Sequence, residues 1–268
     1  MDYVNKESLR GAFASLPLEK IAYFPSIGST NDVVADWVRE GISGPALAVA
    51  DEQTEGRGRA GRRWFTPPGS ALAFSLLLPV IETAKGMLGR TSGLGALAVC
   101  EALNSQYSLD AEIKWPNDVL LDGRKVCGIL AEAHWSGERL NALILGIGIN
   151  IAPPSVPPAK QLTFPATCVE AVLGREVERI DLLTATVASA LNEQKRMHKS
   201  NFIVAWEGQL AYRGKEVHLK GAPGGSQMGE LLGLEEDGSL LLKLEDGEKR
   251  SFQAGEISIQ SLIDRQAK

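Results

Sequence analysis

A segment rich in arginine and glycine is the first part of this sequence whose residue types could do chemistry. Residues 55–70 read EGRGRAGRRWFTPPGS, and four of the seven residues 57–63 are arginines. Its glycines match G-x-G-x-x-G, the dinucleotide-binding fingerprint, which requires a helix to begin within the motif. Pro67 and Pro68 exclude that helix. We therefore expect a mobile loop between two strands that binds a phosphate or carboxylate; a solvated basic loop is the alternative.

A second segment places two lysines beside a predicted hairpin. It reads KWPNDVLLDGRKVCGI, from Lys114, and its central Asp-Gly pair between apolar runs favours a two-residue turn. Such a turn pairs Asp118 with Cys127 and places Lys125 diagonally opposite Asp118. Because a lysine in an apolar strand needs an anionic partner, we expect either a bound anion or a plain Asp118–Lys125 pair on a solvated hairpin.

Three smaller polar sets have both a structural and a functional interpretation. The Ser-Thr-Asn triplet at 29–31, with Asp32 in the acidic position of a capping box, could simply cap a helix. Gln53 follows a buried strand and could be a polar residue at a strand end, and Gly146, Gly148 and Asn150 could mark a close approach of backbone or ligand. The three histidines lie far apart in the sequence, so a histidine-based triad or zinc site has no support.

Hydrophobic periodicity indicates the elements that must position these residues. We expect helices from Ser29 to Gly41 and over 91–106, and mostly helix over 180–207. We expect strands that begin at Ala46 and that span 71–78 and 140–150, and a loop over 151–160. After about residue 210 short strands alternate with Glu-Asp-Gly turns, which predicts a small β-barrel. The predicted domains are therefore 1–210 and 211–268.

Composition and charge narrow the classes of function. The 268 residues carry a net charge of −5, which disfavours general affinity for nucleic acid. The longest apolar run is too short to span a membrane, and the N-terminal residues do not resemble a signal peptide. The widely spaced Cys100, Cys127 and Cys168 suit a reducing compartment, so we expect a cytoplasmic protein.

These pieces together resemble the biotin protein ligases, over about residues 20–262. The resemblance lies in Ser29-Thr30-Asn31, Gln53, GRGRAGRRW (56–64), KWPNDVLLDGRKVCGI (114–129), GIGIN (146–150) and GEISI (255–259). It implies an α+β catalytic fold with a mixed sheet, related to class II aminoacyl-tRNA synthetases, and a C-terminal SH3-like barrel. Some members of this family add an N-terminal DNA-binding domain. Only 28 residues precede Ser29, so we expect the ligase-only type without DNA binding.

The resemblance also implies a reaction. Biotin and ATP form biotinyl-5′-AMP, with Mg²⁺ on the phosphates, and a lysine of a biotin carboxyl carrier protein then takes the biotin. Catalytic roles are implied for Lys125, Arg57, Arg59 and Asp118, the last of which would orient or deprotonate the carrier lysine. Biotin contacts are implied for Ser29, Thr30, Asn31, Gln53, Arg57, Gly58, Arg59, Lys125 and Gly128. Nucleotide contacts are implied for Arg59, Trp64, Lys114, Asn117 and Asn150, with Trp64 also beside the valeryl tail.

Three alternatives stay open at this point. A lipoate–protein ligase shares the fold and chemistry but has no use for groups that bind a ureido ring. A DNA-binding repressor conflicts with the acidic net charge, and a non-catalytic module leaves the arginine loop and Lys125 unexplained. The expected small-molecule groups all precede residue 151, so the barrel is expected to serve carrier docking or the nucleotide side. The oligomeric state, including a homodimer, is open.

Overall fold

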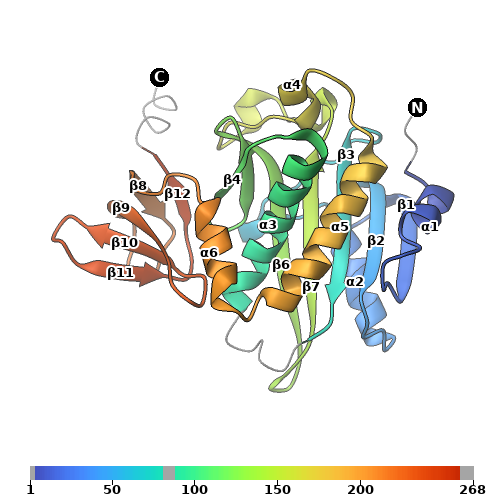
Figure 1. Cartoon of the computed structure of the whole chain (residues 1–268), viewed down its shortest axis with the longest axis horizontal. Coiled ribbons are helices and arrows are strands. Elements are labelled where there is room, and N and C mark those ends of the chain that lie inside the picture. Colours follow the sequence, from blue (N-terminus) through green and yellow to red (C-terminus); the bar gives the residue numbers. More distant parts are fainter. Residues whose placement is uncertain (1–3, 81–87, 260–268) are drawn as a thin grey trace.

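The computed structural model describes residues 4–80 and 88–259 (Figure 1). Its larger sheet contains β1 (Lys20–Ile27), β2 (Ala46–Gln53), β3 (Ala71–Leu78), β4 (Ala111–Lys114), β5 (Asp118–Leu121), β6 (Arg124–Ser136) and β7 (Arg139–Asn150). The strand order is β1-β2-β3-β7-β6-β5-β4. β1 and β2 are parallel and the other neighbours are antiparallel, so the predicted mixed sheet is confirmed.

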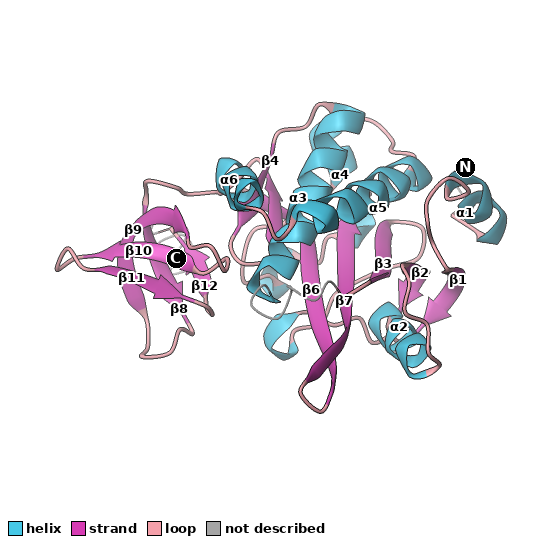
Figure 2. Cartoon of the chain, turned by 60° about the horizontal axis from the view of Figure 1, so that its bottom comes forward, coloured by secondary structure: helices cyan, strands magenta, loops and turns pink. Residues whose placement is uncertain are grey.

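Helices cover both faces of this sheet (Figure 2). α2 (Thr30–Arg39) packs on one face, and α3 (Leu88–Tyr107) and α5 (Arg179–Arg196) lie side by side on the other. The shorter helices are α1 (Lys6–Ala12), α4 (Val169–Leu173) and α6 (Ser200–Gly208). The region expected to be mostly helix over 180–207 is therefore two helices. Arg90 occupies the break, because its guanidinium donates to the carbonyl oxygens of Met197 and Lys199 at 2.5 and 3.3 Å.

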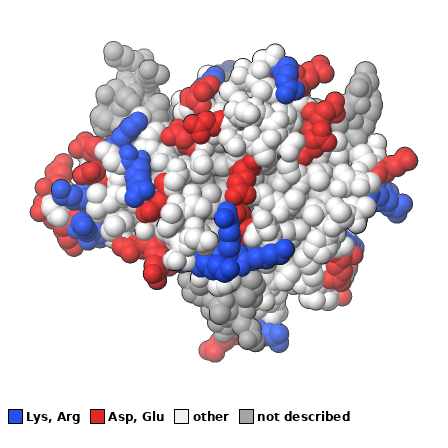
Figure 3. Space-filling model, in the orientation of Figure 1, with Lys and Arg blue, Asp and Glu red and all other residues white. Residues whose placement is uncertain are grey.

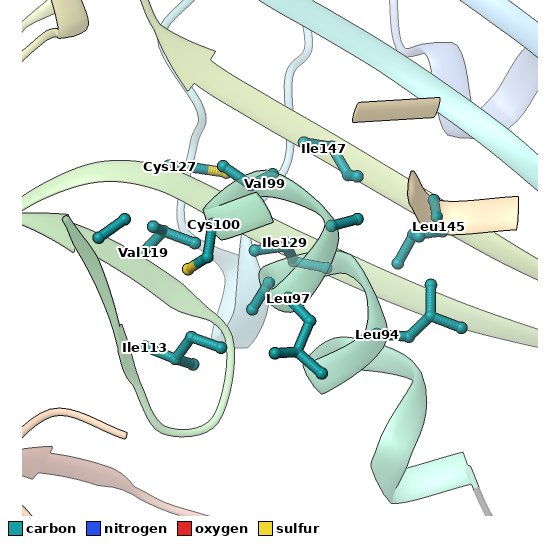
Figure 4. Packing of buried hydrophobic residues seen from close by; sticks show 14 of the residues in the cluster. Leu94, Leu97, Val99, Cys100, Ile113, Val119, Cys127, Ile129, Leu145 and Ile147 are labelled. Atoms are coloured by element: carbon teal, nitrogen blue, oxygen red, sulfur yellow. The ribbon is translucent and has the colours of Figure 1, made fainter. Parts of the chain in front are cut away.

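The main hydrophobic core lies between the sheet and the layer formed by α3 and α5 (Figure 4). Leu94 and Leu97 of α3 pack toward Ile129 of β6 and toward Leu145 and Ile147 of β7. Alternate residues of a strand face opposite sides, so Ile144, Gly146 and Gly148 of β7 face away from this core. The continuous apolar run 142–149 of β7 follows from burial on both faces.

Small residues line the sheet face that carries α2. Residues paired across neighbouring antiparallel strands share one face. The pairings therefore align Ala50, Ala73, Gly148, Gly128 and Asp118 in one row across β2, β3, β7, β6 and β5. Because alanine and glycine fill little space, this row leaves room above the sheet, and Asp118 lies at its end.

Residues 216–258 form a smaller antiparallel sheet. Its strands are β8 (Glu216–Lys220), β9 (Gln227–Leu234), β10 (Leu240–Leu244), β11 (Lys249–Phe252) and β12 (Glu256–Ser258), in the order β11-β10-β9-β8-β12. The predicted series of short C-terminal strands is thus confirmed. The β9–β10 turn packs against the larger part: the Trp115 indole donates to the Gly238 carbonyl at 3.0 Å, and Arg90 Nε donates to the Glu236 carbonyl at 2.5 Å.

The surface carries charges of both signs. On the face that shows α3 and α5, lysine and arginine side chains lie among aspartate and glutamate side chains (Figure 3). Among the helices that the structure describes, none is both long enough and apolar enough to cross a membrane.

Candidate active site

One cavity of about 930 Å³ opens above the row of small residues. Every site residue predicted from the sequence lines it: Ser29, Thr30, Asn31, Gln53, Arg57, Gly58, Arg59, Trp64, Lys114, Asn117, Asp118, Lys125, Gly128 and Asn150. These residues come from the start of α2 and the residue before it, from the ends of β2, β4 and β7, from the β4–β5 turn, from β5 and β6, and from the arginine loop. The tertiary structure therefore brings together groups that are up to 121 positions apart in the sequence.

The arginine loop connects β2 and β3, as expected. Its two arms pair with each other: the Gly58 amide donates to the Arg62 carbonyl at 2.7 Å, and the Trp64 amide donates to the Gly56 carbonyl at 2.9 Å. The only helical turn within it is the three-residue turn Arg59–Gly61. No α-helix starts in the glycine motif, so the exclusion of a dinucleotide fingerprint is confirmed.

The four arginines of the loop have different partners. Arg57 makes two bonds to Asp32, at 2.7 and 2.6 Å, and Arg62 pairs with Glu256. Arg63 donates to the Thr54 carbonyl at 2.9 Å.

Like Arg63, Arg59 has no carboxylate partner among residues 4–80 and 88–259. Its guanidinium donates to Asn117 Oδ1 at 3.2 Å, and burial lowers its pKa from the usual value. A partly buried cation with a neutral partner is suited to receive an anionic ligand.

A buried cluster of charges lies at the β5 end of the cavity. Asp118 Oδ1 is 2.6 Å from Lys125 Nζ, and Asp118 Oδ2 is 3.3 Å from Lys114 Nζ. The expected Asp118–Lys125 pair is therefore present, but the Lys114 and Asp118 side chains are only 1% and 8% exposed, so the expectation that it lies on a solvated hairpin is wrong. Burial raises the pKa of Asp118, but the charges of Lys125 and Lys114 outweigh this effect and hold the pKa below its ordinary value.

The hairpin register differs from the prediction in one respect. Asp118 is paired with Gly128, and Val119 is paired with Cys127, because a β-bulge lies between Val119 and Leu120. The predicted pairing of Asp118 with Cys127 is therefore wrong. The bulge inserts an extra residue into β6, and Lys125 still reaches Asp118 from the same face.

The cations of this region outnumber the carboxylates. Lys114 Nζ also lies 3.4 Å from Glu256, which pairs with Arg62. Lys114, Lys125, Arg59 and Arg62 carry four positive charges, against the two carboxylates of Asp118 and Glu256. The net positive charge suits a site for phosphate and carboxylate groups.

The Ser-Thr-Asn triplet does not cap α2. Ser29 occupies the position before the helix, but its side chain makes no capping hydrogen bond. Asp32, the expected second member of a capping box, bonds Arg57 instead. The capping interpretation is therefore wrong, and the buried side chains of Ser29 and Thr30 line the cavity.

Neutral hydrogen-bonding groups form the opposite end of the cavity. Gln53 Oε1 accepts the Thr30 amide at 2.9 Å and lies 3.1 Å from its hydroxyl. Asn31 Nδ2 donates to Glu132 at 2.7 Å. This end therefore offers amide and hydroxyl groups, in contrast to the cationic end.

Two glycines of β7 are required by close packing. A Cβ at Gly146 would lie 2.4 Å from Asn31 Oδ1, and a Cβ at Gly148 would lie 2.2 Å from Trp64 Nε1. The prediction of a close approach at these glycines is confirmed. The indole Nε1 of Trp64 is buried and has no hydrogen-bond partner within the described part of the chain.

Asn117 and Asn150 line the cavity but are also bound to backbone. Asn117 Nδ2 donates to the Ile129 carbonyl at 2.8 Å, which leaves its carbonyl oxygen to hold Arg59. Asn150 Nδ2 donates to the Thr167 carbonyl at 3.0 Å and so fixes the end of the 151–168 segment. That segment carries no strand or α-helix before Val169 in the described structure, which confirms the predicted loop over 151–160.

Several cavity residues were not predicted. Glu256 reaches the site from the C-terminal sheet, and Phe164 places its ring 4.7 Å from Lys114 Nζ. In the sequence the GEISI segment is only a pattern near the C-terminal end, and a phenylalanine in a loop gives no functional signal. Glu256 contacts Lys114 and Arg62, so the C-terminal sheet contributes to the cationic end.

No group of three or more His, Cys, Asp or Glu side chains suited to a metal ion occurs within residues 4–80 and 88–259. The two carboxylates nearest the cationic end, Asp118 and Glu256, are both paired with cations.

Family comparisons agree with this site. Residues 23–150 match the Biotin/lipoate A/B protein ligase family, and residues 213–259 match the Biotin protein ligase C terminal domain. The first match contains all the predicted site residues. The second contains Glu256.

Individual relatives extend the match over most of the chain. A biotin–[acetyl-CoA-carboxylase] ligase of Paracoccus denitrificans is 32% identical over 209 residues, which cover 76% of this chain and 86% of the relative. A bifunctional ligase/repressor BirA of Salmonella typhimurium is 31% identical over 245 residues, which cover 90% of this chain and 74% of the relative. The structure of the biotin protein ligase from Aquifex aeolicus in complex with biotin and ATP matches with a TM-score of 0.75 and 32% sequence identity. The match covers 90% of this chain and 98% of the Aquifex chain. The cavity and these matches together show that this chain belongs to the biotin protein ligases.

Proposed function

We propose that this chain activates biotin with ATP to biotinyl-5′-AMP and transfers the biotin to a lysine of a biotin carboxyl carrier protein. The observation that carries the proposal is one cavity with a neutral hydrogen-bonding end and a cationic end. Biotin has the same asymmetry, with a neutral ureido ring and an anionic carboxylate. We also assign the larger part to the fold of class II aminoacyl-tRNA synthetases and the C-terminal sheet to an SH3-like barrel.

The neutral end suits the ureido ring. Ser29, Thr30, Asn31 and Gln53 supply hydroxyl and amide groups that can both donate and accept hydrogen bonds. Gly128 and Gly148 let a flat ring or the Trp64 indole approach the sheet closely. Lipoate has no ureido group, so these polar side chains favour biotin over lipoate as the substrate.

The cationic end suits the activation step. The biotin carboxylate must attack the α-phosphorus of ATP, and pyrophosphate leaves as the new anhydride bond forms. Lys125, Arg59 and Lys114 lie where the repulsion between these anions can be offset and the growing negative charge stabilised. Arg57 can join them if it leaves Asp32, and Asn117 orients Arg59.

The transfer step needs an uncharged lysine amine of the carrier, held against the anhydride. Asp118 lines the cavity and can accept a hydrogen bond from that amine. Its lowered pKa makes it a weak proton acceptor, so we assign it to orientation of the amine.

Magnesium is proposed to enter on the phosphates of ATP. Mg²⁺ commonly keeps several waters and takes few protein ligands when it accompanies a nucleotide. The paired carboxylates of Asp118 and Glu256 do not form a resident metal site, so no residue of this chain is assigned as a metal ligand. The three cysteines are free and buried, which supports a reducing, cytoplasmic location.

Biotin-dependent exchange of labelled pyrophosphate into ATP tests the proposal. The purified protein should catalyse exchange with biotin and not with lipoate, and it should label a carrier domain when biotin and ATP are both present. Exchange that lipoate supports equally would favour the lipoate alternative. A protein inert in exchange but able to shift a DNA fragment in a gel would favour a repressor.

The arginine loop is expected to be protected from trypsin by a non-hydrolysable biotinyl-AMP analogue. In the free protein Arg57 and Arg62 are held only by half-exposed ion pairs, which contribute little. A bound phosphate would give the loop cations a shared partner, and closure would exclude water from the anhydride. Cleavage after Arg57, Arg59, Arg62 or Arg63 should slow at least about tenfold, an effect of about 1.4 kcal/mol. Equal rates with and without saturating analogue would contradict ligand-coupled closure.

Glu256→Gln is expected to make the same loop more susceptible to trypsin in the absence of ligand. The substitution removes the charge that ties Arg62 to the C-terminal sheet. A partly exposed ion pair contributes about 0.2–1 kcal/mol, so cleavage should accelerate by no more than about fivefold. Glu248→Gln is the matched control, because Glu248 pairs with Arg250 on the same sheet, away from the cavity. Equal acceleration in both variants would mean that the effect is not local to the Arg62 pair.

A further inference from the structure

A short chain of hydrogen bonds runs behind the neutral end of the cavity. Ser75 is fully buried on β3, and its Oγ lies 2.7 Å from Thr30 Oγ1 and 2.5 Å from Asn31 Oδ1. Asn31 Nδ2 lies 2.7 Å from Glu132 Oε2 on β6. Ser75 and Glu132 do not line the cavity, so any role they have in ligand binding is exerted through the cavity residues that they contact, and Asn31 is the one that both contact.

The chemistry of the partners fixes the orientation of the Asn31 amide. A carboxylate only accepts hydrogen bonds, so the NH₂ group of Asn31 must face Glu132. The amide oxygen then faces Ser75, which must donate its single hydroxyl hydrogen to it. The opposite orientation would place the amide oxygen against the Glu132 carboxylate. Gly146 lies directly beneath the amide, where a Cβ would be 2.4 Å from Asn31 Oδ1.

This orientation leaves one donor for a ligand. Within the described residues, Glu132 is the only acceptor that bonds Asn31 Nδ2, and the amide nitrogen carries two hydrogens. Asn31 is 4% exposed and lines the cavity. A donor held at this end must meet an acceptor, and the ureido carbonyl is the strong acceptor of the biotin ring system.

We propose that Glu132 and Ser75 are positioning residues that hold Asn31 as a hydrogen-bond donor to the ureido carbonyl of biotin. The inference rests on the proposed function, because it assumes that biotin occupies the neutral end. The second oxygen of Glu132 lies 3.8 Å from Arg57 Nη2, which keeps the carboxylate turned with its other oxygen toward Asn31.

Exchanging the two side-chain types tests the proposal. In Asn31→Asp/Glu132→Gln the amide of residue 132 can donate to the carboxylate of residue 31, and its carbonyl can face Arg57. The exchange keeps the net charge and the hydrogen bonds within the protein. Toward the ligand it removes the donor and moves the carboxylate from residue 132 to the cavity wall at residue 31. The single variants Asn31→Asp and Glu132→Gln complete a double-mutant cycle. Glu138→Gln is the matched control, because Glu138 is exposed on the β6–β7 turn.

Thermal unfolding of the free protein and calorimetric binding of biotin and ATP give separate readouts. Asn31→Asp alone should lower Tm, because two carboxylates then face each other, and the double variant should recover most of that loss. The double variant should still bind biotin at least about tenfold more weakly than the wild type, the effect of losing one buried hydrogen bond, with ATP affinity within about threefold.

Recovery of biotin affinity to within about twofold in the double variant would overturn the proposal, since the donor would then be unnecessary. If the change in Tm of the double variant equals the sum of the changes in the two single variants, the inferred orientation of the amide is wrong. A wild-type protein that binds no biotin would reject the proposed function itself, and with it the role of Asn31 toward biotin. The Tm values of the wild type, the two single variants and the double variant would still decide the orientation of the amide. Failure of the proposed function is therefore distinguishable from failure of this inference.

Discussion

Lys125→Met is expected to lower biotin-dependent pyrophosphate exchange at least about hundredfold, the usual cost of removing one well-placed group that stabilises a transition state. Lys125 Nζ lies 2.6 Å from Asp118 and 5.6 Å from the centre of the Trp64 ring, at the junction of the neutral and cationic ends. Methionine keeps the length of the side chain and removes its charge. The loss should appear in the activation step, which pyrophosphate exchange measures directly.

Stability should change little in this variant. Lys114 still pairs with Asp118, and the Lys125 side chain is 23% exposed, so its replacement leaves no fully buried cavity. Lys243→Met on the exposed side of β10 is a matched control that should exchange at the wild-type rate. Exchange by Lys125→Met within about threefold of the wild type would remove Lys125 from the catalytic groups.

Asp118→Asn is expected to destabilise the protein by about 3–5 kcal/mol at neutral pH, because it leaves buried lysines without their shared carboxylate. Lys114 is 1% exposed and retains only Glu256 as an anionic partner. Asparagine has nearly the same size, so the loss would come from charge and not from packing. Urea unfolding measures it, and Asp122→Asn in the exposed turn of the same hairpin is the control, with little expected change.

The same variant should alter the pH dependence of stability. The pKa of Asp118 in the folded protein lies below its ordinary value of 3.8. A lowered folded pKa means that this carboxylate stabilises the fold fully above about pH 4. The contribution is lost as the pH falls further, through the folded pKa. The difference in unfolding free energy between the wild type and Asp118→Asn should therefore shrink below about pH 4. A constant difference down to pH 2 would contradict the ion-pair assignment.

Local sequence was sufficient to predict the strands, turns and loops whose conformation depends only on neighbouring residues. The apolar run of 71–78 is β3, the Asp-Gly pair forms the β5–β6 turn with positive φ at both residues, and the proline-rich segment 151–160 carries no strand or α-helix. The residues of the candidate site could also be named, because their types are chemically unusual in those positions and resemble those of one family. An arginine loop with glycines and a lysine in an apolar strand both need an anion nearby.

Contacts between distant segments decided the rest. The β-bulge at Val119 shifted the partner of Asp118, and turn chemistry alone does not encode an inserted residue. The helix predicted over 180–207 breaks where Arg90, far away in the sequence, binds its carbonyl groups. Glu256 joins the cationic end only because the C-terminal sheet packs beside Lys114 and Arg62.

The Ser-Thr-Asn triplet shows most clearly what the sequence alone determined and what it did not. Its sequence satisfies the pattern of a helix cap and equally that of a ligand site, because the same short polar side chains suit both. The structure distinguishes them, since Asp32 is taken by Arg57 and Asn31 is held between Ser75 and Glu132. Residue types determined which groups could bind biotin. Their hydrogen-bond partners come from β3, β6 and the arginine loop, so only the tertiary structure decided which way those groups face.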